Sequence, residues 1–175
     1  MPDNQKLAGY YDEIACTWSK SDFLLEHFKE YNPSIHTNAD PDYDYLEEKE
    51  CTVVLRNPIC EHHIEFEMAG EFSLYFAGWH SHYFTYEYDF SEMVRDAENI
   101  IVNRSCVIVV KRGDAWVGSC FSENTESIDA AYIKDRFKCS ESMPEELRHE
   151  IDFNGCIANV HFWDNARDFE VIMDE

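Results

Sequence analysis

The fold of this chain is decided by residues 60–82, which read CEHHIEFEMAGEFSLYFAGWHSH. From Cys60 to Met68, apolar side chains alternate with Glu and His. A period of two with one apolar face is typical of a half-buried β-strand. The next three residues, Ala69-Gly70-Glu71, favour a hairpin loop in which Gly70 supplies the left-handed position. A second strand is therefore predicted to begin at Phe72.

The length of this loop sets the register of the hairpin. A three-residue loop pairs Met68 with Phe72, so that the two apolar faces meet. A two-residue loop would instead set Glu67 opposite Phe72 and mix the faces. If the second strand continues without interruption, Cys60 comes to lie opposite His80. Four potential ligands then gather at one end of the core face: Cys60, His62, His80 and His82.

This predicted cluster suggests either a metal site or a catalytic cysteine. Imidazole and thiolate are usual ligands of zinc and other borderline metals. The same group could instead hold Cys60 as a nucleophile beside a histidine base. The competing interpretation is structural, since histidines at the rim of a core often only bond to backbone or carboxylate groups. Because no catalytic motif accompanies the cluster, we assign no catalytic residue and no cofactor other than zinc.

The other face of the hairpin is predicted to be an interaction surface for a protein partner. In the predicted register Glu65 faces Tyr75 and Glu61 faces Trp79. Tyr and Trp are enriched at protein interfaces, and carboxylates around them would suit a basic partner. The predicted binding residues are Glu61, Glu65, Tyr75, Trp79 and Tyr83. The alternative is that helices near the N-terminus cover this face.

Patterns outside the hairpin predict further helices and strands. Helices are expected at residues 7–18, 19–31, 89–101, 127–137 and 145–150, and further strands at 51–56, 106–110, 116–121, 155–163 and 169–173. The acidic segment 38–50 has no clear period and is predicted to be a surface loop. This order predicts one α+β domain over residues 1–175, with a mostly antiparallel sheet built from hairpins and helices packed on one face.

Composition and charge exclude several classes of function. The 175 residues include 36 acidic and 14 basic side chains, which gives a formal net charge of −22. Phosphate binding needs Lys and Arg, so nucleic acid and an anionic membrane surface are unexpected partners, whereas a basic protein is favoured. Seven cysteines without a CxxC pair suggest a reducing, cytoplasmic compartment. We see neither a signal peptide nor a membrane span.

These observations predict a non-enzymatic acidic binding protein. The most concrete version is a bacterial immunity or inhibitor protein that neutralises a basic toxin or nuclease. One alternative is a metal-dependent or Cys/His-dependent enzyme that uses the predicted cluster. A second alternative is a structural domain of a larger assembly.

Overall fold

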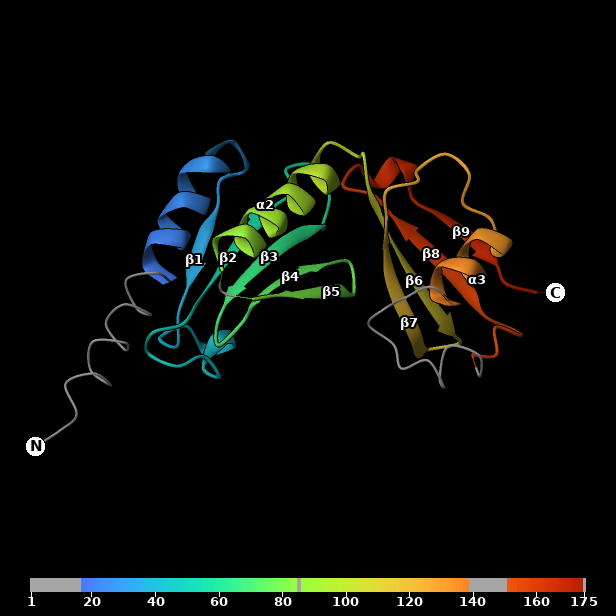
Figure 1. Ribbon diagram of the computed structural model, residues 1–175, viewed down its shortest axis with the longest axis horizontal. Helices are drawn as coiled ribbons and strands as arrows, with labels where there is room; N and C mark the ends of the chain where they lie inside the picture. Colours follow the sequence, from blue (N-terminus) through green and yellow to red (C-terminus); the bar gives the residue numbers. More distant parts are fainter. Residues whose placement is uncertain (1–16, 85, 139–150, 175) are drawn as a thin grey trace, which may run out of the picture. The chain divides into compact units, whose positions relative to one another are not determined.

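The computed structural model describes residues 17–84, 86–138 and 151–174, and these form nine strands in two antiparallel sheets together with three α-helices (Figure 1). The predicted α+β class with antiparallel strands is therefore confirmed. Contacts divide the chain into two compact units. The first unit comprises the described residues up to Tyr75 and His80–Val94, and the second comprises Phe76–Trp79 and the described residues from Arg95 onward.

The first sheet is a five-stranded meander in which the strands follow the order of the chain. Its strands are β1 (Ser34–His36), β2 (Cys51–Arg56), β3 (His63–Met68), β4 (Phe72–Phe76) and β5 (Trp79–Tyr83). Strand β2 pairs antiparallel with β3, so that Val53 lies opposite Phe66 and Leu55 opposite Ile64. All four side chains are fully buried on one face. Sequence analysis did not predict β1, which is only three residues long.

Two helices cover the apolar face of this sheet: residues 17–27, and α2 (Glu87–Ile101) (Figure 1). Just after the first helix, the Phe28 ring stacks on Phe66 of β3 with centroids 5.5 Å apart. Phe90 of α2 meets the ring of Phe72 edge to face at 5.9 Å. The helices therefore close the core predicted for this face of the hairpin.

The boundaries of these helices differ from the predicted ones. Residues 17–27 are one continuous helix, so the predicted start at Ser19 is wrong. The hydroxyl of Ser21 donates to the carbonyl of Trp18 at 2.9 Å, a bond that leaves the helix intact. Helix α2 begins at Glu87, which places Asp89 inside the helix rather than at its N-cap. Most of the predicted helix 7–18, and all of 145–150, lie outside the described residues.

The second sheet has the strand order β7-β6-β8-β9. Its strands are β6 (Cys106–Arg112), β7 (Ala115–Ser122), β8 (Ile157–His161) and β9 (Phe169–Ile172). The central strand β6 pairs antiparallel with both β7 and β8. Helix α3 (Ala130–Lys138) buries Ile133 and Phe137 against one face of this sheet. The four strands predicted for this part of the chain are confirmed, with shifted ends.

The largest departure from prediction is a tight turn between β4 and β5. The prediction of one uninterrupted strand from Phe72 to His82 is wrong, because the chain reverses at Ala77-Gly78. Both residues have positive φ, 50° for Ala77 and 86° for Gly78. Two consecutive positive φ angles are the signature of the type I′ hairpin turn. By contrast, Gly70 does not adopt the left-handed conformation predicted for it, although three residues do separate β3 from β4.

Candidate binding face on the first sheet

The Ala77-Gly78 turn separates the four predicted metal ligands. Cys60 and His62 lie in the loop before β3, whereas His80 and His82 lie on β5. Strand β4 lies between β3 and β5, so the predicted pairing of Cys60 with His80 is wrong. The ligand atoms of these four residues, all of which are described, do not form a group close enough to share one ion.

The same turn changes which side chains share a face. In a two-residue hairpin, the residues on either side of the turn point to the same face of the sheet. Odd-numbered residues of β4 therefore share a face with even-numbered residues of β5. The ring of Tyr75 stacks accordingly on His80, with centroids 5.5 Å apart. A continuous strand would have placed Tyr75 with Trp79 instead.

The five predicted binding residues consequently do not lie on one common surface. Glu65 and Tyr75 lie on one face of the first sheet and are half-buried. Glu61 is exposed in the loop before β3. Trp79 is only 7% exposed, and its ring stacks on Phe121 at 5.3 Å within the second unit. This burial takes Trp79 out of the predicted surface, and the half-buried Tyr83 falls on the same side of β5 as Trp79.

The sheet face opposite the apolar core is here called the outer face. Strand β3 contributes every second residue to it, because its burial alternates between exposed or half-buried and fully buried positions. Contacts between neighbouring strands show that the side chains of β4 and β5 join the same surface. The outer face comprises His63, Glu65, Glu67, Ser73, Tyr75, His80 and His82.

Glu67 lies between two tyrosines on this face. The hydroxyl of Tyr45 donates to Glu67 Oε2 at 2.9 Å, and the hydroxyl of Tyr75 lies 3.5 Å from Oε1. Partial desolvation and the hydrogen bond to Glu67 raise the pKa of Tyr45 to about 12. Desolvation, followed by the charge of Glu67, also raises the pKa of Tyr75. Both phenols therefore remain neutral donors at physiological pH and hold the carboxylate in one orientation.

A second carboxylate on the outer face pairs with a histidine. His63 Nε2 lies 2.9 Å from Glu65 Oε1, and the other ring nitrogen lies 3.3 Å from the carbonyl of Glu61. The hydrogen bond to Glu65 is the main reason that the pKa of His63 is raised. Arg56 of β2 lies opposite His63 in the register of the sheet. This corner of the outer face thus carries both signs of charge.

Strand β5 supplies two histidines at the edge of the sheet. The rings of His80 and His82 meet edge to face with centroids 5.0 Å apart. Ser73 Oγ and Glu71 Oε1 each lie 3.0 Å from His82, and both contacts fall on Nδ1. A Ser-His-Glu relay needs the hydroxyl on one ring nitrogen and the carboxylate on the other. This trio therefore lacks the geometry of a catalytic triad.

The described cysteines include thiols that are poor nucleophiles. Burial raises the pKa of Cys51 to about 11, of Cys106 to about 12 and of Cys120 to about 11. A thiol with such a pKa is protonated at neutral pH and does not attack carbonyl carbon. Cys16 and Cys139 lie outside the described residues. The interactions that the outer face itself displays are hydrogen bonds, ion pairs and ring contacts.

Sequence analysis missed two residues that contact this face, Tyr45 and Glu71. Strand alternation pointed to Glu65 and Glu67, and it placed Tyr75 correctly. Glu71 was assigned only to the hairpin loop. Tyr45 comes from the acidic segment 38–50, which has no period that would reveal its contact with Glu67. The one available signal for β5 was Gly78, a residue that tolerates the positive φ of a turn.

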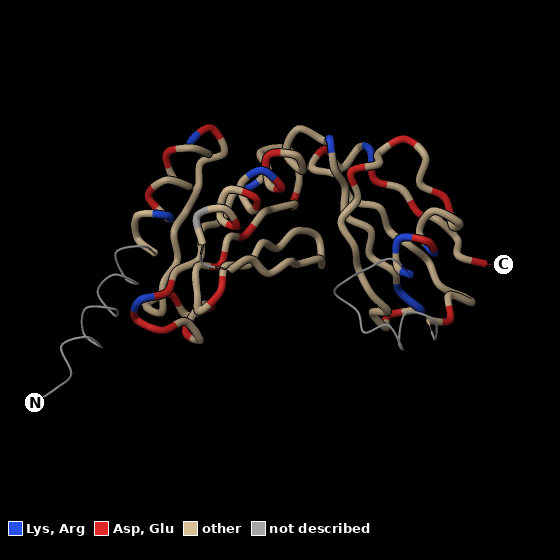
Figure 2. Tube along the Cα trace, viewed as in Figure 1, with Lys and Arg blue, Asp and Glu red and all other residues tan. Residues whose placement is uncertain are grey.

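Comparison with known protein families, curated proteins and solved structures finds no match for this chain. Within the parts of the chain that the structure describes, every helix is too short or too polar to span a bilayer. Figure 2 shows that acidic residues are distributed over both units, with fewer Lys and Arg among them. The case for a function therefore rests on the outer face and on the charge of the chain.

Proposed function

We propose that this protein is a non-enzymatic binding protein that captures a basic polypeptide on the outer face of its first sheet. The most concrete form of this proposal is an immunity or inhibitor protein that neutralises a basic toxin or nuclease. The observation that carries the proposal is Glu67, which two tyrosine hydroxyls hold on a half-exposed surface beside Glu65. A carboxylate fixed in this way is ready to accept hydrogen bonds from Arg or Lys.

Aromatic side chains support this choice of surface. The Tyr75 and His80 rings stack on each other, and Tyr45 is 61% exposed. Tyrosine supplies a large contact area at low entropic cost, and guanidinium groups stack on such rings. The net charge of −22 would also accelerate the approach of a basic partner. The same charge argues against nucleic acid as the ligand.

The other predicted roles have less support. An enzyme that depends on Cys60 and His80 loses the geometry that suggested it, since β4 lies between β3 and β5. The described cysteines are all free thiols, which supports a reducing, cytoplasmic location as part of the proposal. A structural role in a larger assembly remains the alternative to capture of a basic partner, and a binding experiment separates the two.

The test compares two double variants of equal charge. Glu65→Gln/Glu67→Gln removes two charges from the outer face, whereas Glu123→Gln/Glu126→Gln removes two from exposed positions of the second unit. Titration calorimetry with an Arg- and Lys-rich peptide should show a loss of about 10-fold in affinity for the first variant, because each ion pair contributes up to ~1 kcal/mol. The second variant should bind nearly as the parent does.

Four outcomes would contradict the proposal. Equal losses in both variants would mean that binding follows total charge rather than the outer face. Unchanged affinity in the Glu65/Glu67 variant would place the site elsewhere. Absence of binding by the parent at low salt would favour the structural role. Affinity that is indifferent to ionic strength would also count against electrostatic capture.

A further inference from the structure

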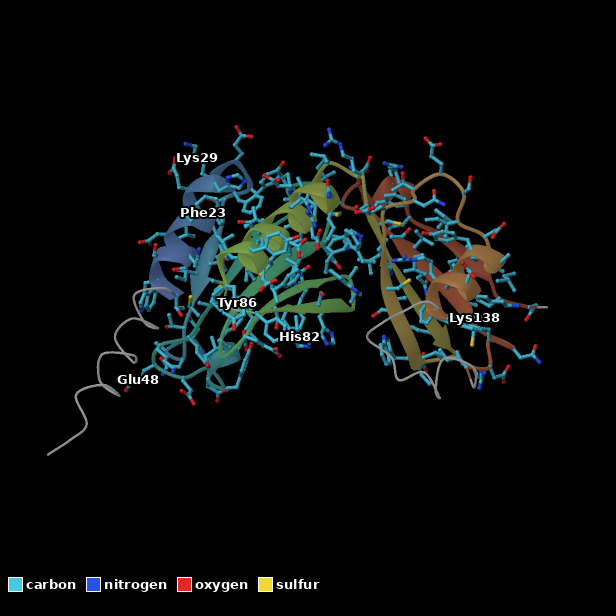
Figure 3. All side chains as sticks on the ribbon, in the orientation of Figure 1. Phe23, Lys29, Glu48, His82, Tyr86 and Lys138 are labelled. Atoms are coloured by element: carbon cyan, nitrogen blue, oxygen red, sulfur yellow. The ribbon has the colours of Figure 1, made fainter. Side chains whose placement is uncertain are left out.

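The histidine pair on β5 forms a feature that capture of a basic partner does not explain. His80 and His82 are two residues apart on one strand, so their side chains emerge on the same face. His80 is exposed, and the side chain of His82 is 50% exposed. Strand β5 is the last strand of its sheet, and Figure 3 labels His82 on it. A cation from solvent can therefore reach both rings.

We infer that His80 and His82 chelate a borderline divalent cation such as Zn²⁺ on the outer face of the first sheet. Zinc binds imidazole nitrogen at about 2.0–2.1 Å in tetrahedral geometry, which sets the centroids of two bound rings about 5 Å apart. The centroids of His80 and His82 are already 5.0 Å apart. The two rings are inclined by 79° in an edge-to-face contact, so they are not stacked on each other.

The surroundings of His82 resemble the outer shell of a metal-bound histidine. A histidine that binds a metal usually donates its second ring N–H to a carboxylate, which fixes the tautomer and the orientation of the ring. Here Glu71 Oε1 lies 3.0 Å from Nδ1 of His82, and Ser73 Oγ lies at the same distance. With Nδ1 engaged in this way, Nε2 is the nitrogen that binds the cation. Glu71 is thus a positioning residue, and His80 and His82 are the ligands.

The charge of the protein also favours a cation here. Glu67 and Glu71 lie on or beside the outer face, and the chain carries 22 more acidic than basic side chains. Such a field raises the local concentration of cations. Two imidazoles, rather than carboxylates, decide which cation binds, because Ca²⁺ and Mg²⁺ prefer oxygen ligands. Waters would complete the coordination of the ion.

The experiment is a titration of the whole protein with ZnCl₂, followed by calorimetry and by NMR of the imidazole nitrogens. His80→Ala and His82→Ala should each weaken zinc binding at least about 10-fold, and Glu71→Gln should weaken it about 10- to 100-fold. His63→Ala is the matched control, since His63 is a half-exposed histidine of the same face. It should leave zinc affinity unchanged. The Nε2 resonance of His82 should shift with zinc, and Nδ1 should not.

Several results would overturn this inference. They are no binding at millimolar zinc, equal zinc affinity in the His80, His82 and His63 variants, and a shift at Nδ1 of His82 rather than Nε2. Ca²⁺ binding as tightly as Zn²⁺ would assign the ion to carboxylates instead. Because the His variants retain Glu65 and Glu67, failure here is distinguishable from failure of the proposed capture of a basic partner.

Discussion

Among the glycines that the structure describes, Gly118 of β7 has the least room for a side chain. A Cβ built at this position would lie 2.6 Å from Cε1 of Phe137, a buried ring of α3. We expect Gly118→Ala to lower the free energy of unfolding by about 1–3 kcal/mol, because the ring must leave a filled site. Chemical denaturation measures this loss.

Gly70 provides the matched control for that substitution. Its added Cβ would meet nothing within 4 Å, and its φ is not positive. Gly70→Ala should therefore change the stability little, or raise it by about 0.4–1 kcal/mol through the unfolded chain. A Gly118 variant as stable as the parent would mean that Phe137 moves without cost.

The His63–Glu65 pair makes a prediction about pH. The hydrogen bond to Glu65 raises the pKa of His63 in the folded protein above the unfolded value near 6.5. The pair therefore stabilises the fold fully below that unfolded value, and the stabilisation is lost as the pH rises through the folded pKa. We expect the parent to exceed His63→Gln in stability at pH 5, and the difference to shrink towards pH 8. Urea titrations across this range test it, and a difference that grows with pH would contradict it.

Among the elements, the β4–β5 turn carries a residue that suits its geometry poorly. Ala77 has φ of 50°, a left-handed conformation that costs an L-residue roughly 1–2 kcal/mol. Type I′ turns prefer Asn-Gly at the two central positions. We expect Ala77→Asn to raise the free energy of unfolding by about 1 kcal/mol. Gly78→Ala should lower it, since φ is 86° at that position. A loss of stability in Ala77→Asn, or no loss in Gly78→Ala, on thermal denaturation would contradict this account of the turn.

This turn also explains why the candidate site was only partly predictable. Alternation from Ile64 to Met68 fixed one strand and its faces, and the three-residue gap before Phe72 was right. Ala-Gly is a weak turn signal beside Asn-Gly, and the alternation continues across it by chance. A two-residue turn reverses the chain and exchanges the faces, so one missed turn moved His80, His82 and Trp79 together.

The predictions for other helices and strands were right or wrong for similarly local reasons. The continuous apolar run of β6 identified a central strand, because both of its faces are covered. Strand β1 has three half-buried residues and no pattern that a sequence could reveal. Ser19 to Asp22 resembles a helix start, yet Ser21 bonds backward within a helix that continues. Contacts between residues far apart in the sequence, such as Tyr45 with Glu67, produce no periodic pattern in the sequence.

On the scale of the whole molecule, neither unit is formed by a single continuous segment of the chain. Phe76–Trp79 belongs by contact to the second unit, although the residues on either side of it belong to the first. The boundary also falls inside α2, between Val94 and Arg95, and the helix is continuous across it. The chain thus passes between the units three times. The sequence predicts one domain over residues 1–175. This prediction can be tested by asking whether the two units unfold together.

We expect the two units to unfold in one cooperative transition. If only one unit unfolded, α2 would have to end near its middle and part of the β4–β5 hairpin would lose its packing. Both changes would also destabilise the unit that remained folded. Differential scanning calorimetry should therefore give a van't Hoff enthalpy equal to the calorimetric enthalpy. Gly118→Ala, in the second unit, should lower the Tm of the whole transition rather than split it. A second peak, or a variant that shifts only part of the melting curve, would show that the units unfold independently.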